Sequence, residues 1–185
     1  AAILFADGRT ERSLAISTAG AEYRPGLLAL REGPALEAAV RALARAPDVL
    51  LVNATGRDHP RRAGLALHLG RLLDLPTIGV THRPLLATGE PPEPRRGASR
   101  PLFLDGDEIG ALVCTGDGLL PLTAHAAWRT TPATAVEVVL AAARGPRTPG
   151  AGPDRAAARG PGVRQGPAPH RRPGALRGRV RGLVP

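Results

Sequence analysis

The chain of 185 residues contains no methionine, no lysine and a single cysteine, Cys114. One cysteine excludes an internal disulfide and a zinc site built from cysteines, because each needs at least one further cysteine. This composition fits a reducing compartment, and we expect the protein in the cytoplasm. Because methionine is absent, the first residue is not an unprocessed initiator, and we expect the chain to be a fragment.

Long hydrophobic runs are also missing. No stretch approaches the roughly 18 consecutive apolar residues that a membrane span needs. No basic segment followed by an apolar segment opens the chain, so no export signal is predicted. Hydrophobic residues make up 43% of the sequence, which is ordinary for a globular domain with one core.

The positive charge is concentrated in the last part of the chain. The formal net charge is +9, but residues 145–185 hold nine arginines and one acidic residue, which leaves residues 1–144 at +1. Gly, Pro, Arg and Ala make up 32 of these 41 residues, too little apolar surface to offset the entropy of ordering. We predict a folded domain over 1–144 and a disordered tail over 145–185, which binds phosphate non-specifically as a secondary property. A frameshift in a GC-rich gene is an alternative origin of the tail.

Hydrophobic patterning in residues 1–144 predicts alternating strands and helices. The strands are expected at 1–6, 12–17, 48–52, 77–80, 102–104 and 109–113. Helices are expected to begin at Pro34, Pro60 and Pro132, because proline is favoured in the first turn. The expected helix after Pro34 is amphipathic, with an apolar face formed by Leu36, Val40 and Leu43.

The order of these segments indicates an α/β fold. The two strands at 48–52 and 77–80 enclose a helix, which makes a βαβ unit with parallel strands and a right-handed crossover. A hairpin is expected to close over residues 105–108, after a proline-rich loop at 83–100. The final helix is expected to have Thr131 as its cap and to turn Val136, Val139, Leu140 and Ala143 inward.

Polar residues follow the first strand of the βαβ unit, at residues 53–62. In an open α/β sheet, functional residues gather at the carboxyl ends of strands. A purely structural interpretation makes Gly56 a turn residue, Asp58 an anion at a helix start, and Arg61 and Arg62 solvated charges. A second polar cluster, Glu22-Tyr23-Arg24-Pro25-Gly26, places an aromatic side chain on a loop stiffened by proline and glycine.

Taken together, these stretches resemble the endonuclease V family. Residues 22–34 are similar to its Pro-Tyr-x-Pro-Gly-Leu-Leu-x-Phe-Arg-Glu-Gly-Pro run, and residues 53–62 to its later Asp-Gly-x-Gly-x-x-His-Pro-Arg. The similarity continues through 64–70 and 75–80 in the same order and covers roughly residues 1–144. It implies a ribonuclease-H-like fold with a mixed central sheet flanked by helices. It also implies a magnesium-dependent endodeoxyribonuclease that recognises deoxyinosine and cuts on its 3′ side.

The resemblance assigns catalytic roles to three residues. Glu32 stands at the family's catalytic glutamate and is expected to bind Mg²⁺, although a glutamate near a helix start is more often a favourable partner of the helix dipole. Asn53 replaces a metal-binding aspartate, and its amide oxygen coordinates a cation without supplying charge. His59 also matches a family position. The family's first aspartate and its late histidine, expected near residues 153–155, have no counterpart here. A catalytically inactive inosine-binding remnant, or a decayed pseudogene product, is therefore the alternative.

The resemblance also implies contacts with DNA. Tyr23, with Arg24, Pro25 and Gly26, matches the family's wedge loop, which enters the duplex so that the modified base leaves the stack. Backbone near Gly26 and Gly79 is expected to lie close to that base.

Further contacts are expected with the DNA backbone. Arg61 and Arg62 are candidate phosphate contacts near a helix N-terminus. His82 stands where many members have a lysine, with a plain loop histidine as the alternative. His68 and His125 have no assigned role and are interpreted as core or surface residues. We expect a monomer whose partner is DNA containing deoxyinosine, with inosine-containing RNA as a second candidate.

Overall fold

The computed structural model describes residues 2–4 and 9–143, so the predicted tail lies outside the described residues. These residues belong to a unit that spans Ala1–Ala151. The strands are β1 (Ala2–Leu4), β2 (Thr10–Arg12), β3 (Leu50–Val52), β4 (Thr77–Thr81), β5 (Ser99–Leu104), β6 (Asp107–Val113) and β7 (Leu122–Ala126). The helices are α1 (Leu28–Arg41), α2 (Leu65–Leu73) and α3 (Pro132–Ala142). None of the described helices is long and apolar enough to cross a membrane.

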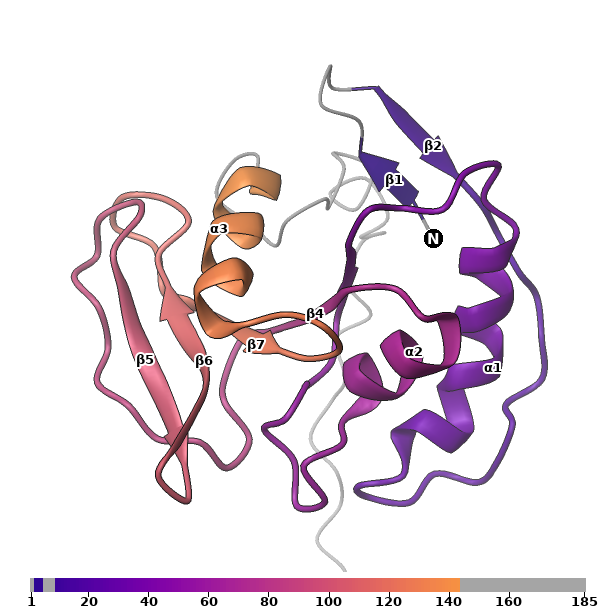
Figure 1. Cartoon of the computed structure of the whole chain (residues 1–185), viewed down its shortest axis with the longest axis horizontal. Coiled ribbons are helices and arrows are strands. Elements are labelled where there is room, and N and C mark those ends of the chain that lie inside the picture. Colours follow the sequence, from indigo (N-terminus) through magenta and orange to yellow (C-terminus); the bar gives the residue numbers. More distant parts are fainter. Residues whose placement is uncertain (1, 5–8, 144–185) are drawn as a thin grey trace, which may run out of the picture. The chain divides into compact units, whose positions relative to one another are not determined.

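Five strands form a mixed sheet in the order β3-β4-β7-β6-β5 (Figure 1). β3 and β4 are parallel, as predicted for the βαβ unit, and the other neighbours are antiparallel. β1 and β2 form a separate antiparallel pair. The α/β fold with a mixed central sheet is therefore confirmed.

The two faces of this sheet differ in chemistry because side chains alternate along each strand. One face carries Ile78 and Val80 of β4 with Ala111, Val113, Leu122 and Ala124 of the neighbouring strands, and α3 covers it through Ala135 and Val139. The opposite face carries Thr77, Gly79 and Thr81 of β4 and Thr123 and His125 of β7. α2 packs on this polar face, where the Thr77 hydroxyl donates to the Ala66 carbonyl (3.0 Å).

The first helix begins six residues earlier than predicted. α1 begins at Leu28 and contains Pro34 in its interior. Packing explains the difference, because Leu28 and Ala29 in the first turn lie against the core cluster of α2 and β3. Pro34 has no N–H to donate to the Leu30 carbonyl. The backbone at Gly20 lies against that turn, and the Gly20 N–H donates to the Arg31 carbonyl (3.0 Å).

The second helix begins later than predicted. α2 begins at Leu65, not Pro60, and Leu65 and Leu69 are buried on its inner face. Residues 53–64 instead form a series of turns, in which Gly64 N donates to Gly56 O (2.8 Å). Arg62 adopts a left-handed conformation (φ 54°), which a right-handed helix from Pro60 would not allow.

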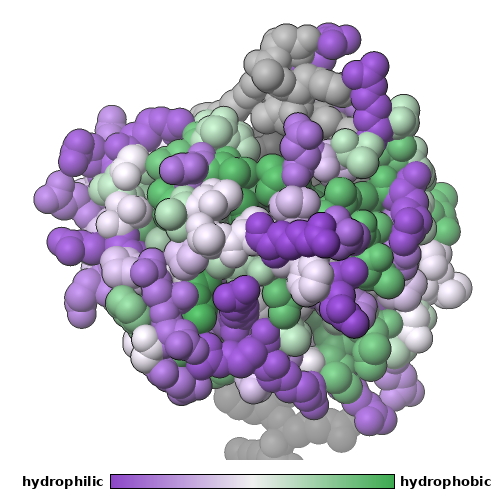
Figure 2. All heavy atoms as spheres, in the orientation of Figure 1, coloured by the Kyte–Doolittle hydropathy of each residue, from purple (hydrophilic) through white to green (hydrophobic). Residues whose placement is uncertain are grey.

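The prediction of a strand at 12–17 was wrong, whereas the hairpin and the last helix are confirmed. β2 ends at Arg12, and Leu14 and Ile16 are exposed. β5 and β6 pair around the predicted turn, and both strands extend further than predicted. At the start of α3, the Thr131 side chain accepts from Thr134 N (3.2 Å). Hydrophilic side chains rim the surface on the side of the β5–β6 hairpin, whereas larger apolar areas lie on the side of α1 (Figure 2).

The central strand β7 was not predicted. All five of its residues, Leu-Thr-Ala-His-Ala, are buried between β4 and β6. Its apolar residues are mostly alanines and Thr123 is its only β-branched residue, so the sequence carries little of the β-branched and aromatic enrichment that marks a strand. Strand pairing on both sides compensates for this weak local preference.

Candidate functional site

The candidate site lies where β3 ends, because the chain after Asn53 folds back over the polar face of the sheet. Asn53 is exposed and Ala54 is buried. A Cβ on Gly79 of β4 would lie 2.3 Å from the Ala54 carbonyl oxygen. Gly79 is therefore required for the loop to cross the sheet, whatever it contributes to base binding.

The two polar clusters found in the sequence contact each other. Arg61 donates from Nη1 to the carbonyl of Gly26 (3.0 Å). His59 is 7% exposed, and its Nδ1 accepts from the Arg61 backbone N–H (3.2 Å). A Cβ on Gly26 would lie 3.7 Å from His59 Nε2, and the Gly26 φ of 75° strongly favours glycine. The structure thus brings the Tyr23 loop and the His59 turn together.

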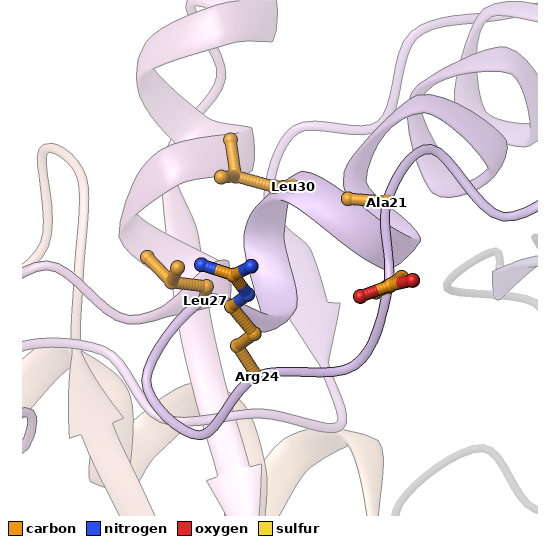
Figure 3. A pocket seen from close by; sticks show the side chains of 5 residues that line it. Ala21, Arg24, Leu27 and Leu30 are labelled. Atoms are coloured by element: carbon orange, nitrogen blue, oxygen red, sulfur yellow. The ribbon is translucent and has the colours of Figure 1, made fainter. Parts of the chain in front are cut away.

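The loop that precedes α1 presents its aromatic side chain to solvent. Tyr23 is 66% exposed, and Arg24 and Pro25 beside it are also exposed. A hollow of about 260 Å³ adjoins the loop. Its lining residues are Ala21, Glu22, Arg24, Leu27 and Leu30. Figure 3 shows the Arg24 guanidinium directed toward Leu27 and Leu30. An exposed aromatic residue in the loop before α1 is suited to contact a partner.

Glu32 is placed on the face of α1 that carries Leu28 and Leu36. It lies four residues after Leu28 and four before Leu36, so the three share one face of the helix. Leu28 and Leu36 pack against the cluster that contains Val52 and Ala54, the residues on either side of Asn53. Glu32 itself is exposed, and within the described residues no side chain pairs with its carboxylate.

These residues offer an incomplete set of ligands for Mg²⁺. Mg²⁺ takes oxygen ligands, usually one or two carboxylates together with water and substrate phosphates. Glu32 supplies one carboxylate and Asn53 one neutral amide oxygen. In residues 2–4 and 9–143, no group of three or more His, Cys, Asp or Glu side chains is placed to hold a metal ion. At the two positions that the resemblance assigns, the described part of the chain therefore offers one charged and one neutral oxygen ligand.

Arg61 and Arg62 are placed differently. Arg61 is exposed at the candidate site. Arg62 donates from Nη2 to the Leu104 carbonyl (2.9 Å) and to the carboxylate of Asp105 (2.9 Å) in the β5–β6 turn. These contacts link residues 53–64 to the hairpin, so Arg62 has a structural role that its sequence context did not predict.

The interpretation of Asp58 as an anion at a helix start was wrong. Asp58 is completely buried, and its carboxylate accepts three backbone N–H groups of the loop after β4. Leu85 N is 2.6 Å from Oδ2, whereas Leu86 N and Ala87 N are 2.7 and 2.9 Å from Oδ1. Asp58 therefore joins the segment that carries His59 to the loop that follows His82.

His125 of β7, which had no assigned role, lies beside Asp58. Its Nδ1 is 3.8 Å from Asp58 Oδ2, and its Nε2 is 2.8 Å from the Thr81 hydroxyl. Thr81 donates to the Arg83 carbonyl (2.7 Å), so the Nε2–H of His125 donates to Thr81. Burial lowers the pKa of His125 to about 4, against the opposing effect of the Asp58 carboxylate. His125 is thus neutral at pH 7. The sequence carried no clear signal for it, because β7 itself was not predicted.

His82 follows the carboxyl end of β4 and is exposed. Its side chain is accessible to a phosphate, as its predicted role requires. His68 on α2 lies against α1, where a Cβ on Gly33 would be 3.7 Å from its ring. His68 therefore belongs to the contact between the two helices.

Comparison with known proteins identifies similar sequences along most of the chain. The family model for endonuclease V matches residues 4–158, which extends past the predicted domain end at 144. Endonuclease V of Roseiflexus sp. is 43% identical over 119 residues, which cover 64% of this chain and 54% of that protein. Endonuclease V of Streptomyces coelicolor is 46% identical over 100 residues, 54% of this chain and 43% of that protein. The chain spans about half the length of these curated relatives.

Solved structures show the same fold. The Streptomyces avermitilis endonuclease V is 40% identical with a TM-score of 0.65, covering 69% of this chain and 56% of that one. The catalytic domain of human endonuclease V is 32% identical with a TM-score of 0.63, covering 70% and 59%. Endonuclease V of Ciona intestinalis, bound to a 24mer DNA containing an inosine, is 19% identical with a TM-score of 0.58, covering 71% and 64%, and is similar in fold.

Proposed function

Because the chain belongs to the endonuclease V family, we propose that it is a magnesium-dependent endodeoxyribonuclease. Its substrate would be DNA containing deoxyinosine, which it hydrolyses at a phosphodiester bond on the 3′ side of the modified nucleotide. The observation that carries the proposal is the contact between the Tyr23 loop and the His59 turn, made by Arg61 and Gly26. This contact unites an exposed aromatic side chain with residues at the carboxyl end of a parallel strand.

Tyr23 would act as the wedge in substrate recognition. Its exposed ring would enter the duplex beside the modified base and replace the stacking that the base loses when it leaves the helix. Unstacking and unpairing cost a few kcal/mol, and the cost is lower for a weakly paired base such as hypoxanthine. Gly26 leaves space next to His59 for close approach of the nucleic acid. The same contacts would accept inosine in RNA as a second substrate.

Exposed cationic and polar groups around the loop would hold the phosphates. Arg24, Arg61 and His82 are all exposed on segments next to the site. Arginine binds phosphate through a bidentate fork, whereas histidine binds it best when protonated. Contacts of this kind position the duplex and carry no sequence information.

Glu32 and Asn53 are the residues that would hold the divalent metal. When bound, such a metal activates water and stabilises charge on the attacked phosphate. Glu32 supplies the charged ligand of the pair. Asn53 supplies only an amide oxygen, so Asn53→Asp is expected to tighten Mg²⁺ binding, measured by calorimetry, whereas Glu32→Gln is expected to weaken it.

The test of the proposal is a nicking assay with the purified chain, magnesium and a labelled duplex that contains one deoxyinosine. We expect a single cut on the 3′ side of the modified nucleotide, and no cut in the presence of a chelator or in a duplex without inosine. Tyr23→Ala is expected to reduce affinity for the inosine duplex without changing the thermal unfolding midpoint. Equal affinity of the two proteins would exclude the wedge role.

A second candidate function is binding of inosine-containing nucleic acid without catalysis. The neutral ligand Asn53, together with the incomplete ligand set of the described residues, favours this alternative. It predicts selective binding of the inosine duplex with no nicking by the wild type, and nicking by none of the single variants. We expect the protein to be a cytoplasmic monomer in either case, which sedimentation analysis and cell fractionation would test.

A further inference from the structure

The buried carboxylate of Asp58 connects two segments that are far apart in sequence. One is the turn that carries His59 and Arg61, and the other is residues 82–87 after β4. All three hydrogen bonds to Asp58 come from main-chain N–H groups of residues 85–87. The connection therefore depends on the side chain of Asp58 and on the main chain of residues 85–87.

The side chains of the second segment do not account for its position. Leu85 is 55% exposed and Leu86 is 45% exposed. Apolar side chains that point away from the core contribute little to holding a loop in place. Only Ala87 of the three is buried, and it packs in the small cluster with Leu102 and Ile109. The main attachment of residues 85 and 86 is thus their hydrogen bonding to Asp58.

A carboxylate in this position has a high desolvation cost. Burying a charge is unfavourable unless it accepts strong hydrogen bonds, and three N–H donors meet that requirement. The arrangement is sensitive to small chemical changes, because an amide in place of the carboxylate would put an NH₂ group against a main-chain N–H.

Hydrogen bonds of Thr81 hold the same segment at its other end. Thr81 donates to the carbonyl of Arg83 and accepts from His125, which lies beside Asp58. One end of residues 81–87 is therefore attached to the polar face of the sheet and the other end to Asp58. His82 lies between these attachments and is exposed.

We propose that Asp58 is a positioning residue that holds residues 82–87 against the His59 turn, so that both segments meet inosine-containing nucleic acid in one fixed arrangement. The inference rests on the proposed function, because it concerns the same site. Asp58 itself touches no substrate. It acts through the placement of His59 on one side and of His82 to Leu86 on the other.

The test compares Asp58→Asn with Asp117→Asn in the full chain. Asp117 is a matched control, because its carboxylate also accepts a loop N–H (Arg96 N, 2.7 Å) but is exposed and belongs to the β6–β7 connection. We expect amide hydrogen exchange of residues 85–87 to rise about tenfold or more in Asp58→Asn, as one lost charged hydrogen bond implies. Affinity for a deoxyinosine duplex should fall about tenfold, with a smaller loss for an unmodified duplex.

Thr81→Val provides a milder variant in case Asp58→Asn does not fold. It keeps the shape of the side chain and removes the hydroxyl that binds Arg83 and His125, so exchange and affinity should change in the same direction by a smaller factor. Faster exchange with unchanged discrimination between the two duplexes would show a merely structural role and overturn the proposal. Unchanged exchange at 85–87 would overturn it as well. If the wild type itself does not prefer the inosine duplex, the proposed function fails, and the exchange data alone decide whether Asp58 holds the loop.

Discussion

The buried imidazole of His125 should make the stability of the fold depend on pH. His125 is completely buried, and burial lowers its pKa from 6.5 to about 4 in the folded chain. In the unfolded chain the ring returns to water and its pKa returns to the ordinary value. Between these two values the unfolded state binds a proton that the folded state does not, so the free energy of unfolding falls as the pH falls.

The size of this effect follows from the two pKa values. Each factor of ten in proton affinity is worth about 1.4 kcal/mol, so His125 accounts for about 3 kcal/mol between pH 7 and pH 4. The stabilisation is fully present above pH 6.5 and is lost as the pH approaches 4. This is a large share of the stability of a small domain.

Urea unfolding from pH 7 to pH 4 measures the effect, with His125→Gln as the comparison. Glutamine has no titrating group, and the acidic residues of the two proteins are the same. The difference in unfolding free energy between the wild type and the variant should therefore shrink by about 3 kcal/mol as the pH falls to 4. A difference that stays constant with pH would show that the imidazole is not held neutral by burial, and the reasoning would be wrong.

Three further predictions concern packing and capping. Leu69→Ala should lower the free energy of unfolding by about 3 kcal/mol because Leu69 is 1% exposed in the α2 core; a loss below 1 kcal/mol in urea unfolding would contradict this packing. Gly79→Ala should cost about 2 kcal/mol, because the new Cβ would lie 2.3 Å from the Ala54 carbonyl oxygen, and a thermal unfolding midpoint equal to that of the wild type would refute the close approach. Thr131→Ala should cost about 1 kcal/mol through loss of the bond from Thr134 N to the capping hydroxyl; hydrogen exchange in the first turn of α3 should rise, whereas unchanged exchange would argue against the cap.

Segments with strong local patterns were predictable from the sequence. The apolar run of β4, the hairpin around residues 105–108 and the capped α3 all follow from neighbouring residues, since turn chemistry, capping and hydrophobic periodicity act over a few positions. The family resemblance likewise rested on contiguous motifs, and the family model confirms it. The contact between the Tyr23 loop and the His59 turn was not predicted, because Arg61 and Gly26 are 35 residues apart and no single motif contains both.

Elements whose stability comes from distant contacts were not predictable. α1 starts at Leu28 because packing against α2 outweighs the effect of Pro34, and β7 is a strand because both of its neighbours pair with it. Asp58 received its role from three N–H groups 27 to 29 residues away. The sequence alone therefore determined the local elements and the family. The tertiary structure decided which polar residues are buried together, because burial depends on residues that meet only after folding.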